Sequence, residues 1–227
     1  TKTVDENFPF KNFNEIEFDV IASRQKSYNG VVIASKFKIN EINRILPFYN
    51  QDIIEDDQAR FLHVKIESIN IICLYLPNGN PAPGPKYDYK INWMKRLIKY
   101  TKEIYDKNEP LILGGDFNVI QDENDCYDVS KWQDDALYLK KTRRCMKELI
   151  NIGLYDSYRL KYPNLKEYSF WDYQAGAWQK DNGIRIDFFL ISPEIVDTLI
   201  DVGIDKRPRG QEKPSDHTPI WIEIENF

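Results

Sequence analysis

The stretch that decides the fold runs from Leu111 to Asn118 and reads Leu-Ile-Leu-Gly-Gly-Asp-Phe-Asn. Its three apolar residues follow Pro110 and predict a strand that is buried on both faces. The glycine pair then allows the backbone to turn and to pass close to a ligand. In open α/β sheets, ligands collect beyond the carboxyl ends of the strands. Here that position holds a carboxylate and a carboxamide, Asp116 and Asn118.

These two polar residues are two positions apart. An extended backbone through Phe117 would point both polar side chains to one side and the phenyl ring to the other. The pair would then offer an acceptor and a donor on one surface. The alternative is that Asp116 or Asn118 merely caps a turn or a helix start, which is the commoner role of a lone aspartate after a strand. Partners elsewhere in the chain decide between these interpretations.

The composition is that of a globular chain. With 227 residues, 42% of them hydrophobic, it can bury one large core, and we expect a single domain over residues 1–227. The aromatic content of 14% suits both a core and surfaces that stack on bases or sugars. The net charge of −5 argues mildly against a nucleic-acid partner. Basic clusters at 140–144 and 206–209 could line a phosphate track or simply face solvent.

The cysteines and the apolar segments of the sequence indicate the cellular compartment in which the protein is expected. Three cysteines, an odd number without close metal-ligand spacing, favour a reducing environment. The sequence contains neither a run long enough to span a membrane as a helix nor a secretory signal pattern. We therefore expect a soluble, cytoplasmic protein without a membrane partner.

Apolar patterns predict most of the secondary structure. A hairpin is expected between residues 18–22 and 30–35. A half-exposed strand is expected over 61–66, and a buried strand over 69–76. Helical spacing predicts long helices over 87–105 and 140–152. The chain closes with strands over 184–192, 202–204 and 220–224, and Ser192-Pro193 predicts a short helix. The order strand, helix, strand between 69 and 113 indicates an α/β class.

A second set of polar residues lies near the carboxyl terminus. Asp187 and Arg185 occur in an otherwise apolar strand, where a charge must be paired, either with each other or with another group. His217 is one of only two histidines, whereas His63 lies in an alternating strand and is expected to be an ordinary exposed or core residue. Ser215, Asp216 and His217 suggest a hydrolase triad, but adjacent side chains project in different directions and cannot align.

These residues do suit the hydrolysis of a phosphodiester. An imidazole oriented by a buried carboxylate, with another carboxylate available for a metal ion, is a workable arrangement, and Asp187 is a suitable partner for His217. Attack by water requires a positioned water and neutralisation of the growing negative charge. Asp116, Asn118 and a hard cation held by oxygen ligands meet those needs.

Several segments resemble ordered motifs of the endonuclease/exonuclease/phosphatase superfamily. They are Gly-Asp-Phe-Asn at 115–118, Arg-Ile-Asp-Phe-Phe-Leu at 185–190, Ser-Asp-His-Thr-Pro at 215–219, Tyr-Leu-Pro-Asn-Gly at 75–79, Asn-Gly-Val-Val-Ile at 29–33 and Ser-Phe-Trp-Asp-Tyr at 169–173. Together they are similar to the exonuclease III branch, the abasic-site DNA repair enzymes, over nearly the whole chain. The resemblance implies a four-layered α/β sandwich of two packed mixed β-sheets flanked by helices.

The resemblance also implies catalytic roles. Asp116 would orient and deprotonate the attacking water, and Asn118 would bind that water or the transition state. His217, paired with Asp187, would contact the scissile phosphate. Tyr75 would hold the phosphate from another side as a further catalytic residue.

Binding roles follow from the same resemblance. Asn78 would contact the phosphate together with the catalytic groups. Mg²⁺, or Mn²⁺ in its place, would bind at Asp216, with Asp116 and Asn118 beside it. A narrow apolar pocket would accept an extrahelical sugar without a base, and it would be lined by Phe170, Trp171, Ile184 and Ile186.

One departure from the family pattern concerns the start of the chain. Family members begin with a strand that ends in an Asn-containing element, followed by a helix and a strand ending in Gln-Glu-Thr-Lys, whose Glu is the principal metal ligand. Here the chain opens at Thr1-Lys2, where that Thr-Lys would stand. We therefore expect that the amino-terminal segment, with the metal-binding Glu and two strands, is missing, and that a chain without it is nearly inactive and poorly stable.

The function that this resemblance implies is hydrolysis of duplex DNA 5′ to abasic sites, with 3′-5′ exonuclease and 3′-phosphodiesterase or phosphatase activity. Its partner would be double-stranded DNA with abasic sites or blocked 3′ ends, bound by a monomer. Two alternatives stay open at this point. One is a superfamily phosphatase or phospholipase that acts on small or lipid phosphates, and the other is a non-catalytic DNA-binding remnant.

Overall fold

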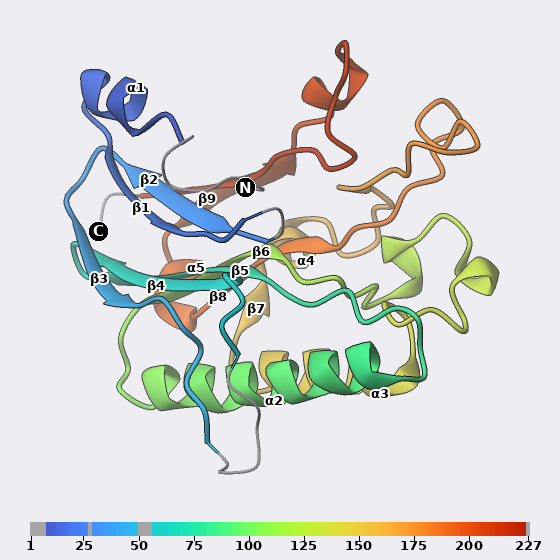
Figure 1. The fold of residues 1–227 in the computed structure, drawn as a ribbon, viewed down its shortest axis with the longest axis horizontal. Helices are drawn as coiled ribbons and strands as arrows, with labels where there is room; N and C mark the ends of the chain where they lie inside the picture. The colour runs from blue at the N-terminus through green and yellow to red at the C-terminus, as the bar shows by residue number, and fades with distance from the viewer. Residues whose placement is uncertain (1–7, 27–28, 50–55, 226–227) are drawn as a thin grey trace.

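The centre of the computed structural model, which describes residues 8–26, 29–49 and 56–225, is a six-stranded mixed sheet (Figure 1). Its strands, in spatial order, are β3 (Ile39–Asn43), β4 (Phe61–Ile66), β5 (Ile69–Tyr75), β6 (Leu111–Asp116), β8 (Asp187–Ile191) and β7 (Tyr155–Asp156). The central pair β5 and β6 is parallel, and the other pairs are antiparallel. The buried strand predicted after Pro110 is confirmed as β6.

Two helices cover one face of this sheet (Figure 1). Helix α2 (Pro85–Tyr105) makes the crossover that a parallel pair requires, and α3 (Lys140–Ile150) packs beside it. The apolar faces of both helices and the underside of β4, β5, β6 and β8 form the largest core cluster. Both predicted helices are confirmed. The first begins two residues earlier than expected because Pro85 occupies its opening position.

Two hairpins cover the opposite face (Figure 1). One pairs β1 (Asp19–Ser23) with β2 (Val31–Ser35), and the other pairs β9 (Leu199–Ile204) with β10 (Ile220–Ile224). The α/β class with mixed sheets is confirmed. In the described ranges, however, the second layer consists of two separate two-stranded sheets rather than one continuous sheet.

Short elements complete the described part of the chain: α1 (Phe10–Glu15), η2 (Glu123–Asp125), η3 (Val129–Lys131), α4 (Ser157–Lys161), α5 (Pro193–Val196) and η4 (Pro208–Gly210). Of these, the sequence predicted only α5, which follows Ser192 as expected. Among the described helices, none combines the length and apolar character that a membrane span needs.

The burial predicted for two neighbouring strands was wrong in both cases. The first four residues of β4 are buried, although the pattern predicted a half-exposed strand, and β5 alternates, although it was expected to be buried throughout. Strand β4 lies between β3 and β5, and its residues pack both against the helical layer and under the β1–β2 hairpin. The small hairpin leaves the upper face of β5 only partly covered. His63 on β4 is accordingly a core residue, with Tyr100 Oη 2.7 Å from Nδ1 and Asn70 Oδ1 3.1 Å from Nε2.

The strand predicted over 184–192 is shorter than expected. Regular pairing begins only at Asp187, whereas Ile184 forms isolated bridges with Cys126 and Phe170. Arg185 is therefore outside the ladder and turns into the protein interior.

The glycine pair of β6 serves close packing between strands. Gly115 has φ +139°, and a Cβ atom at this position would overlap the carbonyl oxygen of Leu74 on β5. A Cβ on Gly114 would lie 2.6 Å from Cε1 of Phe189 on β8. Both neighbours of β6 can therefore approach it closely only because it lacks side chains here.

We predict that Gly115→Ala destabilises the protein by roughly 3 kcal/mol or more, because it adds backbone strain to an overlap with a backbone atom. Urea unfolding followed by circular dichroism measures the effect. Gly176→Ala is the matched control, since Gly176 also has positive φ (+64°) but its nearest neighbour would lie 3.6 Å from the added Cβ. The control should lose only roughly 1 kcal/mol. Equal losses in both variants would contradict the role given to the Leu74 contact.

Candidate active site

Three polar side chains form a row at the carboxyl end of the parallel strands. The register pairs Tyr75 on β5 with Asp116 on β6, and Asp116 with Asp187 on β8. Directly paired residues of neighbouring strands point to the same face of a sheet. Two carboxylates and a phenol predicted from separate parts of the sequence are therefore neighbours.

Asp116 fits both interpretations that the sequence left open. Its Oδ1 accepts a hydrogen bond from the backbone N–H of Asn118 (2.8 Å), which is the turn-capping role. Its Oδ2 accepts from the Asn118 carboxamide nitrogen (3.0 Å), so the two side chains also meet on one surface. The backbone is not extended here as assumed, because Asn118 has φ +48°. Phe117 packs away from them, buried edge-to-face against Phe188 with ring centroids 5.5 Å apart.

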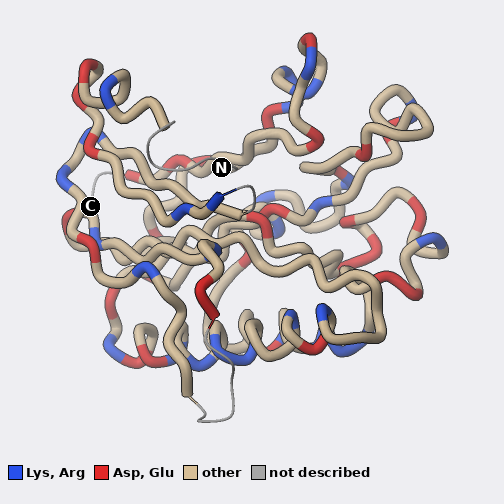
Figure 2. The backbone as a smooth tube through the Cα atoms, viewed as in Figure 1, with Lys and Arg blue, Asp and Glu red and all other residues tan. Residues whose placement is uncertain are grey.

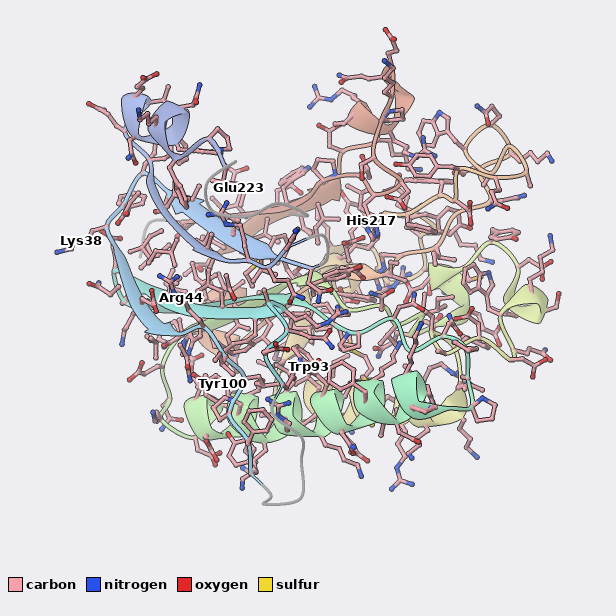
Figure 3. The ribbon with its side chains drawn as sticks, viewed as in Figure 1. Lys38, Arg44, Trp93, Tyr100, His217 and Glu223 are labelled. Carbon is pink, nitrogen blue, oxygen red and sulfur yellow. The ribbon has the colours of Figure 1, made fainter. Side chains whose placement is uncertain are left out.

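His217 reaches this row from the loop before β10 (Figure 3). Its Nδ1 lies 2.9 Å from Asp187 Oδ2, and its Nε2 lies 3.9 Å from Asp116 Oδ2. Ser169 Oγ donates to the same Asp187 oxygen (2.6 Å) and so fixes the carboxylate. Ser215 Oγ accepts a hydrogen bond from the backbone N–H of His217 (3.1 Å) and not from its imidazole ring. This contact agrees with the rejection of a hydrolase triad.

The alternative pairing of Asp187 with Arg185 was wrong. Arg185 is buried and donates from Nε to Asp125 (2.8 Å) and from Nη2 to Asp156 (2.7 Å). Asp125 is also bonded to Arg159. This buried network ties the segment before β8 to η2 and to the start of α4. Asp187 is consequently left to His217.

The electrostatics of the row depend on burial and on like charges. Burial and the neighbouring Asp187 raise the pKa of Asp116 to about 7. Burial opposes protonation of His217, but Asp187 and then Asp116 outweigh it and raise the pKa of this imidazole to about 9. Burial and then Asp116 also raise the pKa of Tyr75. Near neutral pH the site therefore holds a cationic imidazole, a neutral phenol and a carboxyl group close to its titration point.

A pocket of about 330 Å³ opens beside the row. Of the residues predicted for the site, it is lined by Tyr75, Asn78, Asp116, Asn118, Phe170, Ile184, Ile186, Asp216 and His217. Asp187 lies behind His217 and acts on the pocket through it. The lining thus combines polar groups with the apolar side chains of Phe170, Ile184 and Ile186.

Trp171 does not belong to this set, and its assignment to substrate binding was wrong. Its side chain is 0% exposed. The indole N–H donates to Asp181 (3.0 Å), and the ring packs edge-to-face on Trp178 with centroids 4.9 Å apart. Only Phe170 of the pair faces the pocket, because successive residues of an extended segment point in opposite directions.

The sequence did not identify six further residues that line or support the pocket. Five of them line it, namely Asn80, Trp132, Asp135, Leu137 and Asp172, and Asn80 binds both oxygens of Asp135 at 3.1 Å. Lys90 lies beneath it in α2. Burial lowers the pKa of Lys90 to about 7, against the opposing influence of Asp116 and Asp135. A lysine on the apolar face of a helix, between Tyr87 and Ile91, was the available signal.

The donor set suits a cation that keeps much of its water. In the described part of the chain no three carboxylate, histidine or cysteine side chains are grouped closely enough to hold a metal. Asp116 and Asp216 nevertheless line one pocket, and Mg²⁺ is often bound through one or two carboxylates with waters and phosphate oxygens. Asn118 fits this role less well than expected, because its Oδ1 accepts from the Asn78 carboxamide (3.1 Å).

The two basic clusters have different surroundings. Residues 140–144 open α3, in the helical layer, which carries both basic and acidic residues (Figure 2). In the second cluster Lys206 pairs with Glu167 (3.5 Å) and Arg207 with Asp205 (2.7 Å). Arg209 is buried and donates to the carbonyl oxygen of Trp171 (3.1 Å). Internal pairing therefore accounts for the second cluster.

Comparisons with known proteins agree on one family. A model of the Endonuclease/Exonuclease/phosphatase family matches residues 3–217. Exodeoxyribonuclease III of Haemophilus influenzae is 30% identical over 239 residues, which cover 98% of this chain and 86% of that protein. A solved AP endonuclease from Archaeoglobus fulgidus is similar with a TM-score of 0.91 at 31% identity, covering 100% of this chain and 86% of that one. A 3′ phosphatase from Neisseria bound to a product DNA hairpin gives 0.91 at 30% identity, with 99% and 86% covered.

We predict that Asp187→Asn lowers the pKa of His217 from about 9 to below its ordinary value of 6.5, because burial then dominates. A proton NMR titration of the histidine rings in EDTA measures this, and His63, with a pKa lowered to about 4 by burial, is the internal reference. Asp106→Asn, at the exposed end of α2, is the control and should leave both values unchanged.

The stability difference between wild type and Asp187→Asn has a defined pH dependence. Because the folded-state pKa exceeds the unfolded value of 6.5, the pair contributes stability that is fully present below pH 6.5 and lost as the pH rises through about 9. An unchanged His217 titration in Asp187→Asn would contradict the pairing.

Proposed function

This chain belongs to the Endonuclease/Exonuclease/phosphatase family, and on that premise we propose that it is a DNA repair nuclease of the exonuclease III type. The observation that carries the proposal is the convergence of Tyr75, Asp116, Asn118 and His217 on one pocket, with Asp187 behind the imidazole. The match from residue 3 to 217 supports one family domain over the chain. The relatives reported above, named for abasic sites or DNA ends, support DNA as the substrate rather than a small or lipid phosphate.

Asp116 is the proposed general base. Its pKa near 7 is matched to the removal of a proton from water at neutral pH. The Asn118 N–H and carboxamide hold the carboxylate in one orientation. Asn118 would also contact the attacking water or the transition state, since its carboxamide lies beside the base.

His217 is the proposed electrostatic partner of the scissile phosphate. With its pKa raised to about 9, the imidazole is protonated at neutral pH and can donate from Nε2 to a phosphoryl oxygen. Asp187, itself held by Ser169, fixes the ring through Nδ1. Tyr75 and Asn78 would bind the phosphate from the other side of the pocket, as neutral donors.

Mg²⁺, or Mn²⁺ in its place, would supply neutralisation of phosphate charge when bound. We propose that Asp216, with Asp116 beside it, holds this cation through oxygen ligands, while waters and the phosphate complete the shell. The support is that the carboxylates of Asp116 and Asp216 line the same pocket.

The apolar residues that line the pocket suggest which DNA substrate the enzyme would select. Phe170, Ile184 and Ile186 would accept a deoxyribose without a base and would leave the polar groups of a base unpaired. We therefore propose cleavage 5′ to abasic sites in duplex DNA, together with removal of 3′ nucleotides and of 3′ blocking groups. Three free cysteines agree with a reducing compartment, and we propose a cytoplasmic monomer.

The protein expressed from its full coding sequence should nick a duplex with one synthetic abasic site in Mg²⁺, and excess EDTA should abolish the nick. Gel analysis of an end-labelled strand measures both. A non-catalytic binder would retain affinity without cleavage, and a lipid or small-phosphate enzyme would act on neither strand. Full nicking activity in EDTA would contradict the metal requirement.

Asp116→Asn and His217→Ala should each lower kcat on this substrate by a factor on the order of 10² or more, because each removes a group that acts in the transition state. Asp134→Asn is the control, since this exposed carboxylate lies outside the pocket wall. Steady-state kinetics separate kcat from KM. A rate equal to that of wild type in either variant would remove the role given to that residue.

A further inference from the structure

Lys90 is a charged group with an unusual position beneath the pocket. Its side chain is 0% exposed, although it belongs to a long amphipathic helix, α2. The Nζ atom donates to the backbone carbonyl oxygens of Asn78 (2.9 Å) and Asn118 (2.6 Å). The ammonium therefore joins two loops that follow neighbouring parallel strands.

The two acceptors belong to residues that supply two of the pocket's carboxamides, Asn78 and Asn118. The Asn78 side chain donates to Asn118 Oδ1 (3.1 Å), and the Asn118 side chain donates to Asp116 Oδ2 (3.0 Å). Lys90 thus holds the main chain of the same residues whose side chains pair above it. A shift of either carbonyl would move a carboxamide relative to Asp116.

The loop is shaped to the stem of this lysine. Gly79, with φ +92°, lies directly after Asn78, and a Cβ at this position would be 2.6 Å from Cδ of Lys90. The next residue, Asn80, is fixed in turn by Asp135. The contact between loop and lysine is therefore close along the whole side chain.

Burying an ammonium group is costly, and an apolar side chain of similar length would fill the same space without that cost. The amino group is useful here because one Nζ can donate to two carbonyl oxygens at once, whereas a methionine could donate to none. A purely structural tie between α2 and the sheet would also use such bonds. Loss of such a structural tie would lower the stability of the protein, but it would not by itself change the positions of the carboxamides.

We propose that Lys90 is a positioning residue of this site, which fixes the backbones of Asn78 and Asn118 and thereby keeps the Asn118 carboxamide on Asp116 and the Asn78 carboxamide facing a bound phosphate. The inference rests on the proposed function, since it assumes that a phosphate occupies the pocket. Lys90 itself does not contact the phosphate.

The central experiment compares Lys90→Met with Lys95→Met, a change at an exposed lysine on the same helix. On abasic duplex DNA, Lys90→Met should lower kcat by about 10- to 100-fold with a smaller change in KM, because misplaced groups act poorly in the transition state. Lys95→Met should stay within about twofold of wild type. Circular dichroism checks that both variants are folded at the assay temperature. If Lys90→Met does not fold, Lys90→Gln keeps N–H donors without the charge and should give an intermediate kcat.

A double-mutant test separates positioning from a general structural role. In a protein that already carries Asn78→Ala and Asn118→Ala, the further change Lys90→Met should lower kcat by no more than about twofold. An undiminished loss in that background would overturn the inference, because Lys90 would then act by a route other than the carboxamides.

A spectroscopic readout keeps this inference distinct from the proposed function. The side-chain NH₂ signals of Asn78 and Asn118 in nitrogen-15 NMR spectra should move in Lys90→Met and stay in place in Lys95→Met. If wild-type protein fails to cleave abasic DNA, the proposed function fails, and these signals still test the positioning. Signals unchanged in Lys90→Met would overturn the inference whatever the substrate.

Discussion

The register between β5, β6 and β8 is the constraint on which the site depends. It places Tyr75, Asp116 and Asp187 side by side on one face of the sheet. A slip of one residue would turn each side chain to the opposite face, into the helical layer. Gly115 helps to enforce the register, because only a residue without Cβ can lie against Leu74 at this point. The chemistry at the strand ends is thus fixed by backbone packing several ångströms away.

Around this row, buried charged side chains hold other protein groups in a fixed orientation and do not themselves face the pocket. Arg185 satisfies Asp125 and Asp156, which leaves Asp187 to the imidazole of His217. Lys90 binds carbonyl groups and holds the two loops that carry the carboxamides. Each buried charge costs desolvation energy, and each is compensated by hydrogen bonds of good geometry. The raised pKa values of Asp116 and His217 follow from the same low-dielectric surroundings.

Secondary structure was predictable wherever one period dominated the sequence. The helix over 85–105 and the strand after Pro110 have long apolar patterns, and both were identified. The burial of β4 and β5 was not, because it depends on which layer covers each strand and how completely. Strand β7 has only two residues and β3 is mostly exposed, and both lie at the edges of the large sheet, so their patterns carry little signal.

The sequence by itself determined the chemical groups of the site, since Asp116, Asn118, Asp216 and His217 stand in short motifs whose order resembles a known family. The sequence proposed His217 as the partner of Asp187 but left Arg185 open as an alternative, and only the tertiary structure decided between them. It gave Asp187 to His217 and Arg185 to Asp125, buried Trp171, and brought Lys90 under the pocket. The physical reason is that a motif records neighbours along the chain, whereas partners such as residues 187 and 217 meet only through strand register and loop packing. Local spacing contains no information about those distances.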